Sequence, residues 1–143
     1  MRTVADWRFA DASLLLRKGG SAHTNGAMYL AGFVVECLLK AKLLEENGWL
    51  QKAWSTEGLS KAQQHLWWLC YRSHDLDAIL ARLPMVTERL SRQEQHGSMG
   101  LANALKAICA QWTVHARYAT RRASIDEAEG FLGRIKELRK WLR

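Results

Sequence analysis

The sequence predicts an all-α protein, an up-and-down bundle of four to five helices, and three observations favour this class. The 143 residues include a single proline, Pro84, the residue that most strongly interrupts a helix. Long stretches are rich in Ala, Leu, Glu, Lys and Arg, which lose little freedom in a helix. Apolar residues recur at three- and four-residue steps, and no alternating strand pattern is present. At about 100 to 200 residues per domain, residues 1–143 form one domain.

The first helix is expected from about Val4 to Lys18, ended by Gly19-Gly20. Its apolar stripe consists of Val4, Trp7, Ala10 and Leu14. The second helix is expected to begin at a Thr24 or Asn25 N-cap and to end at Gly48 in a left-handed conformation. Because it is apolar nearly all round, neighbouring helices or a second subunit must cover it on several sides.

The Trp-rich segment 49–70 holds one expected helix, KAQQHLWWLCYR, which Ser60 would cap. Ser73 is expected to cap the next helix, HDLDAILARL, with Asp75 and Asp77 favourable in its first turn. Pro84 marks the end of that helix or a kink. Residues 49–83 are therefore expected to add two shorter helices.

Two amphipathic helices complete the chain. The first carries a stripe of alternating four- and three-residue steps: Leu101, Leu105, Ile108, Trp112 and His115. The last opens with a capping box, Ser124 with Glu127 three residues later. Its basic residues gather at the negative end of the helix dipole, which accounts for much of the positive charge: Arg134, Lys136, Arg139, Lys140 and Arg143.

Composition excludes several classes of protein. Three cysteines far apart, Cys37, Cys70 and Cys109, fit neither a disulfide framework nor a zinc site. The first residues lack the apolar core of a secretory signal, so we expect no leader, and the longest uncharged apolar run, Ala27 to Val35, is too short to span a bilayer. No phosphate loop, dinucleotide fingerprint, zincin or esterase motif is present. We therefore expect a cytoplasmic protein without membrane association, metal or cofactor.

Charge on the second helix is confined, from Ala27 to Ala41, to Glu36 and Lys40, which lie one turn apart. A buried charge needs a partner, because an unpaired one costs several kcal/mol. One interpretation is an internal ion pair that fixes the register of the helix or of a dimer seam. The other is that the two residues form the floor of a polar cleft that binds a nucleotide or RNA.

The segment VHARYATRR, residues 114–122, is the densest basic and aromatic cluster. Arg117 could grip a phosphate while His115 moves a proton, which is the chemistry of phosphodiester cleavage. Tyr118, Arg121 and Arg122 would add contacts to RNA or a nucleotide. Alternatively, His115 and Arg117 bond free carbonyls at a helix end, and the other arginines keep a loop solvated.

A second candidate binding site comprises Arg72 and His74, which flank Ser73 at the expected start of a helix. Free amides at a helix N-terminus can hold an anion. The alternative is that His74 and Asp75 only cap and tether that helix.

Three segments together resemble the HEPN family of small helical domains, and their order and spacing carry the likeness: YLAGFVVECLLKAKL (29–43), SHDLDAIL (73–80) and ARYATRRASIDEAEGFL (116–132). The resemblance covers most of the chain and marks residues 49–70 as an insertion. It implies a dimer with a polar cleft near its seam, often encoded beside a minimal nucleotidyltransferase in a toxin-antitoxin or defence system.

Many HEPN domains are metal-independent ribonucleases with an Arg followed by His after four to six residues. Here the positions after Arg117 hold Arg121, Arg122, Ala123 and Ser124, with no His. Two functions follow as hypotheses. The first is a dimeric RNA- or nucleotide-binding module that works with a nucleotidyltransferase partner. The second is an endoribonuclease in which His115 or His74 replaces the missing histidine.

Overall fold

The computed structural model describes residues 1–143 except 54, 96–99 and 113–120, and without the side chains of 94, 95 and 111. The described residues contain helices and no strand, which confirms the all-α bundle. The α-helices are α1 (Arg2–Gly19), α2 (Thr24–Glu46), α3 (Lys61–Tyr71), α4 (Leu76–Leu80), α5 (Pro84–Gln95), α6 (Gly100–Gln111) and α7 (Ile125–Leu142), with 3-10 turns at Gly20–His23 and Gly48–Gln51.

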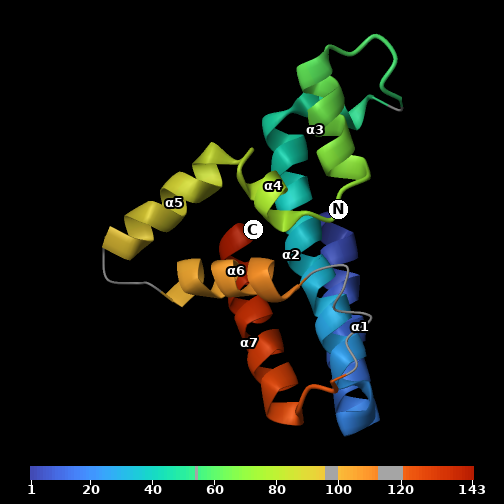
Figure 1. The fold of residues 1–143 in the computed structure, drawn as a ribbon, viewed down its shortest axis with the longest axis vertical. Coiled ribbons are helices and arrows are strands. Elements are labelled where there is room, and N and C mark those ends of the chain that lie inside the picture. The colour runs from blue at the N-terminus through green and yellow to red at the C-terminus, as the bar shows by residue number, and fades with distance from the viewer. Residues whose placement is uncertain (54, 96–99, 113–120) are drawn as a thin grey trace.

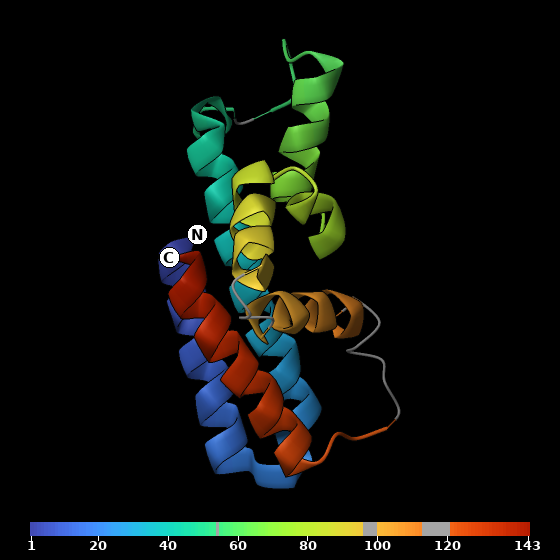
Figure 2. The ribbon, with the colours of Figure 1, turned by 90° about the vertical axis from the view of Figure 1, so that its left-hand side faces the viewer.

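Three long helices form the body of the bundle. α1 and α2 make an antiparallel pair, and α7 packs along α2 in the same direction as α2. α6 lies across these helices, as the two ribbon views agree (Figures 1 and 2). α3 lies beyond the N-terminal end of α1, beside the last turns of α2. The side of α2 that α1 and α7 leave open therefore faces α4 and α6.

The hydrophobic core is continuous and is centred on α2. Most of its largest fully buried side chains come from α2, α6 and α7: Leu38, Leu39, Leu43, Leu105, Ile108, Phe131, Ile135 and Leu138. The 3-10 turn after α2, the helices α3 and α4, and the residue before Pro84 add Leu50, Leu69, Ile79 and Leu83. Burying a side chain of this kind contributes about 1.5–3 kcal/mol. The prediction that α2 is covered on several sides is thus met by helices of the same chain.

α1 turns a different face to the core from the one expected. Ala5 and Ala12 are fully buried against the bundle, whereas Val4, Trp7 and Leu14 are exposed. Small side chains let two helix backbones approach closely, and in α1 the face with these alanines packs against the bundle in place of the face with the larger apolar residues. The end of α1 is as predicted, because α1 stops at Gly19 and Gly20 adopts a φ of 52°.

Both predicted ends of α2 need correction. The N-cap is His23, and the side chains of Thr24 and Asn25 are used elsewhere, as described below. Gly48 does not adopt a positive φ, because α2 ends at Glu46 and Gly48 opens a 3-10 turn.

The region of α3 to α5 mixes confirmed and wrong predictions. Ser60 caps α3 in a capping box with Gln63. Asp75, and not Ser73, caps α4, because the Asp75 carboxylate accepts from the Ala78 amide at 2.9 Å. Pro84 opens α5, a helix that the sequence did not predict, in the first-turn position where proline costs nothing.

Three further expectations from the sequence can be compared with the structure. Ser124 and Glu127 form the predicted capping box of α7. The three cysteines are free, and burial raises the pKa of Cys70 to about 11 and that of Cys109 to about 12. Among the described residues, no helix is long and apolar enough to cross a membrane.

Candidate functional site

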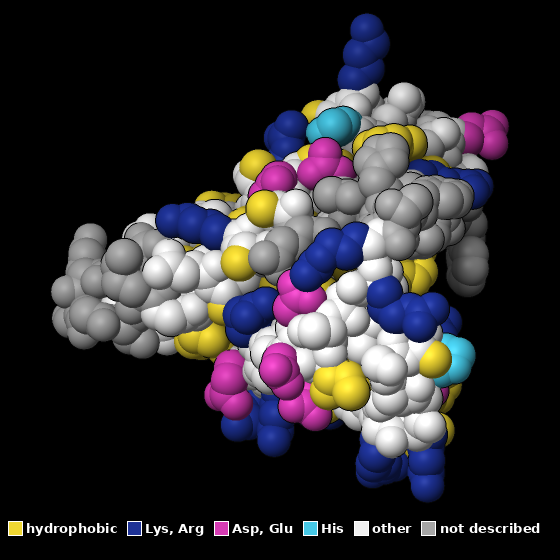
Figure 3. Space-filling model, turned by 60° about the horizontal axis from the view of Figure 1, so that its bottom comes forward, with side chains coloured by type: hydrophobic (Ala, Val, Ile, Leu, Met, Phe, Trp, Pro, Cys, Tyr) yellow, Lys and Arg dark blue, Asp and Glu magenta, His cyan; other side chains and the backbone are white. Residues whose placement is uncertain are grey.

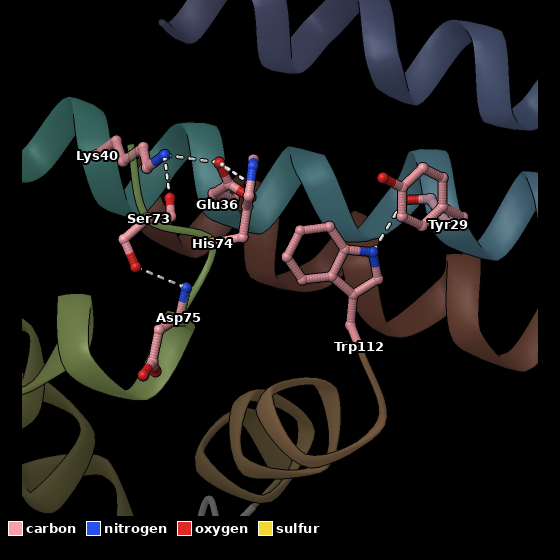
Figure 4. A network of polar contacts seen from close by, with 7 residues as sticks. All are labelled: Tyr29, Glu36, Lys40, Ser73, His74, Asp75 and Trp112. Atoms are coloured by element: carbon pink, nitrogen blue, oxygen red, sulfur yellow. Dashed lines mark hydrogen bonds and ion pairs between the residues drawn. The ribbon is translucent and has the colours of Figure 1, made fainter. Parts of the chain in front are cut away.

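Glu36 is the centre of a polar network on the open side of α2 (Figure 4). Its carboxylate accepts a hydrogen bond from the Lys40 ammonium at 2.7 Å, and both side chains are buried, with 5% and 7% exposed. Lys40 also donates to the Ser73 carbonyl at 2.7 Å. The predicted ion pair one turn apart is therefore present, and it ties α2 to the connector before α4.

His74 completes this network from outside. Its Nδ1 lies 3.0 Å from Oε2 and 3.2 Å from Oε1 of Glu36. The His74 side chain is 47% exposed, whereas the carboxylate that holds it is buried. The sequence put these residues in separate candidate sites, and the fold joins them across 38 positions.

The connector between α3 and α4 is fixed on both sides, which explains how His74 reaches α2. The Ser73 amide donates to the Trp68 carbonyl at the end of α3, at 3.0 Å. The Ser73 hydroxyl accepts from the Asp75 amide at 3.0 Å. With its carbonyl on Lys40, Ser73 has no freedom to turn, so His74 projects toward Glu36. Sequence reasoning assigned Ser73 only a helix cap and missed this role.

Two aromatic rings continue along α2 from His74. Phe33 packs edge-on to the His74 ring at 5.9 Å between centroids, and Tyr29 packs edge-on to Phe33 at 5.0 Å. All three side chains are partly exposed. We call Tyr29, Phe33 and His74 the ring strip. It joins an imidazole to two apolar rings on one side of a rigid helix.

Trp112, at the end of α6, forms the support of the ring strip. Its indole is buried, donates from Nε1 to the Tyr29 carbonyl at 2.9 Å and packs edge-on to Phe33 at 5.0 Å. Gly32 makes this contact possible, because a Cβ at that position would lie 1.9 Å from Trp112 Cδ1. A glycine in the middle of an apolar helix was the sequence signal for this close approach.

The Glu36–His74 pair is arranged for acid–base chemistry or for polar recognition. An ionised carboxylate can only accept hydrogen bonds, so it selects the neutral tautomer of His74 that carries its proton on Nδ1 and a lone pair on Nε2. Among the described residues, no hydrogen bond to Nε2 is formed. A carboxylate behind a histidine fixes its tautomer and orientation, which suits Nε2 to accept a proton or a hydrogen bond.

The arginines that the sequence predicted to bind RNA or a nucleotide lie apart from His74. Arg72 turns back over the Trp67 ring, 5.9 Å from its centroid, and lines a cavity of about 320 Å³ beside α3. Arg121 pairs with Glu127 at 2.9 Å, and Arg122 is exposed. The Asn25 side chain donates to the Arg121 carbonyl at 2.9 Å, which places Arg121 about 16 Å along α2 from Glu36. His115, Arg117 and Tyr118 lie outside the described residues.

The side chains at the start of α2 bind the connector that leads into α7, at residues 121 and 123. Thr24 is fully buried and its hydroxyl donates to the Ala123 carbonyl at 2.7 Å. The Asn25 carboxamide accepts from the Ala123 amide at 2.8 Å while donating to Arg121. Since Trp112 is held at Tyr29 and Ala123 at Asn25, residues on both sides of the basic and aromatic segment are attached to the same helix.

The positive charge of the chain does not form one continuous patch at the end of the bundle where α1 meets α2. Lys and Arg side chains are spread over this face, with acidic side chains between them (Figure 3). The described residues also contain no cluster of three His, Cys, Asp or Glu side chains that could hold a metal ion. We therefore expect a ligand of the Glu36–His74 site to be recognised by the side chains of that site and of the ring strip.

Comparison of the chain with family models, with curated proteins and with solved structures returned no match.

Proposed function

We propose that the protein is an RNA- or nucleotide-binding module whose binding site is the ring strip with Glu36 behind it. The observation that carries the proposal is the half-exposed His74, held by a buried carboxylate and continued by two partly exposed rings. Unpaired bases stack on such rings and bond to polar groups beside them. The net charge of +7 favours a polyanionic partner.

The proposed module acts as a homodimer with a minimal nucleotidyltransferase partner in a toxin-antitoxin or defence system, as the HEPN resemblance implies. Support for a second copy comes from α1, whose outward face is apolar: Val4, Trp7 and Leu14 are exposed, Trp7 by 64%. Arg8 and Asp11 border this face with opposite charges. An antiparallel copy of α1 would meet it with the same apolar residues and with the charges reversed, as a two-fold interface requires.

The test of the binding module is a titration of a labelled, mixed-sequence single-stranded RNA at several salt concentrations. We expect binding that weakens as salt rises, because phosphate contacts release counterions. The His74→Ala variant should weaken binding by about tenfold, the value of one good polar contact. His65→Ala is the matched control, since His65 is exposed on α3 and lies outside the ring strip. Salt-independent binding, or equal loss in both variants, would contradict the proposal.

A second function, metal-independent RNA cleavage, is favoured by the same Glu36–His74 pair, because Nε2 is free to act as a general base. Incubation of the RNA with the protein in EDTA separates the two. The binding module leaves the RNA intact. A ribonuclease cleaves it and loses the activity in His74→Ala if His74 replaces the family histidine, or in His115→Ala and Arg117→Ala if the basic segment does.

A further inference from the structure

A groove of about 700 Å³ lies between α5, α6 and α7, away from the ring strip. Arg89 contributes from α5, Leu101 and Ala104 from α6, and Arg134 and Trp141 from α7. This volume falls within the range of small-molecule sites, about 300–1,000 Å³, and far exceeds that of a single inorganic ion. The groove therefore has room for an organic ligand of moderate size.

The charges in the groove favour an anion. Arg89, Arg134 and Lys140 face a single acid, Glu137, which pairs with Lys140 at 3.0 Å. Neither Arg89 nor Arg134 forms an ion pair with a carboxylate of the described residues. Two uncompensated guanidinium groups match the double charge of a phosphate ester better than the single charge of a carboxylate.

Both guanidinium groups are held against aromatic rings. Arg89 lies over the Trp141 ring, 4.6 Å from its centroid, and Arg134 lies 5.9 Å from the Phe131 centroid. A guanidinium that packs through its flat face keeps its N–H edge available for a phosphate. The rings thereby restrict two long side chains that would otherwise lose conformational entropy on binding.

Buried donors at the groove lack acceptors. Trp141 Nε1 and Arg134 Nε are buried, and neither has a hydrogen-bond partner. Native proteins satisfy nearly all such groups, so each unsatisfied one calls for an explanation. Both belong to residues that line the groove, where oxygen atoms of a ligand could supply the acceptors after a small local shift.

The apolar side of the groove is also open. Gly100 and Gly133 line it, and a Cβ at either position would meet no atom within 4 Å. Gly133 lies inside α7, where alanine would favour the helix. The glycine leaves free space next to Leu101 and Ala104 for the uncharged part of a ligand.

We propose that this groove binds a phosphorylated small molecule, with its phosphate held by Arg89 and Arg134 and its organic part over Leu101 and Ala104. The site shares no residue with the ring strip and does not rest on the proposed function.

The experiment is calorimetric titration of the full chain with two phosphate esters, adenosine 5′-monophosphate and glucose 6-phosphate, and with adenosine and glucose as their unphosphorylated counterparts. At least one ester should bind at millimolar concentration or below, and its counterpart should bind at least about tenfold more weakly. Failure of both esters to bind, or equal binding of the counterparts, overturns the proposal.

Variants locate the site. Arg89→Gln with Arg134→Gln should weaken binding of the ester by about tenfold or more. Arg82→Gln with Lys136→Gln removes the same charge from exposed positions outside the groove and should leave binding unchanged. Equal loss in the two double variants would reduce the effect to overall charge and overturn the site.

Gly133→Leu fills the groove without a change of charge and should abolish binding, while its circular dichroism and melting temperature stay at or above those of the parent. His74→Ala should bind the ester as the parent does. Loss of binding in His74→Ala with retention in Gly133→Leu would move the ester to the ring strip and overturn the groove site.

Discussion

Gly32 is the residue at which the packing of α2 against Trp112 leaves no space for a side chain. The neighbouring residues of α2 are apolar, and glycine is a poor helix former, so helix propensity alone gives no reason for a glycine there. The indole occupies the missing volume and reaches the Tyr29 carbonyl. One absent methyl group thus makes room for the indole that supports the ring strip.

Gly32→Ala should lower the free energy of unfolding by about 2 kcal/mol, because displacement of a buried indole outweighs the helix preference of alanine. Gly133→Ala is the control, since its Cβ meets open space, and it should gain up to about 1 kcal/mol. Urea denaturation followed by circular dichroism measures both. In a Trp112→Ala background, Gly32→Ala should no longer destabilise. A gain in stability for Gly32→Ala in the parent chain would contradict this account of the packing.

Half of the candidate site was predictable at the residue scale. Glu36 and Lys40 lie one turn apart on one helix, so their pairing follows from local geometry. His74 joins them only because the Ser73 connector crosses α2, a contact between distant parts of the sequence. Residue spacing carries no information about such a crossing, and the sequence therefore left His74 in a separate group.

Among the elements, two of the predicted helix starts were correct, whereas the N-caps predicted for α2 and α4 were wrong. The capping boxes of α3 and α7 each lie within four residues, and both are present. The face of α1 was wrong because periodicity identifies an apolar stripe without identifying what covers it. α5 was missed because the sequence interpretation took Pro84 as the end of a helix or a kink, whereas Pro84 begins a helix.

The capping box of α7 gives a prediction about pH. The Ser124 amide and then the Arg121 guanidinium hold the pKa of Glu127 below its usual value. A lowered pKa stabilises the fold above the pKa of the unfolded chain, near 4.3, and this contribution is lost as pH falls through the folded value. The stability difference between the parent and Glu127→Gln should therefore be full at about pH 7 and shrink as the pH falls below about 4.

Ser124→Ala serves as the control for that titration. It removes the hydroxyl that accepts from the Glu127 amide at 3.1 Å, and it should cost about 1 kcal/mol. Since the hydroxyl does not ionise, most of this loss should persist at low pH. A Glu127→Gln difference that is the same at neutral and at low pH would contradict the charged capping interaction.

For self-association of the whole molecule, the position of the exposed apolar surface matters more than the net charge. The outer face of α1 carries Trp7 on one of the longest helices, and α7 covers the other side of the pair. A self-associating protein would place this face against a second copy. The ring strip and the α5–α6–α7 groove would both stay accessible in such an arrangement, because neither includes a residue of α1.

Sedimentation of the parent chain across micromolar concentrations should show a dimer, and Trp7→Glu should shift it to monomer, because a charge would be buried at the interface. Trp68→Glu is the matched control: Trp68 is 51% exposed on α3, outside the proposed interface, and should leave the dimer intact. A monomeric parent, or dissociation by both variants, would exclude the α1 interface.

The contact between the two ends of the chain has a kinetic consequence. Arg139 on the last helix donates to Asp6 on the first at 3.0 Å, and Arg2 donates to the Arg143 carbonyl at 3.3 Å. The hairpin of α1 and α2 needs only local contacts and can form early, whereas docking of α7 closes a loop of nearly the whole chain. Such closure is slow relative to local pairing. We therefore expect docking of the last helix to limit the rate at which the core is completed, and a chain interrupted before α7 to expose the apolar side of α2 to aggregation.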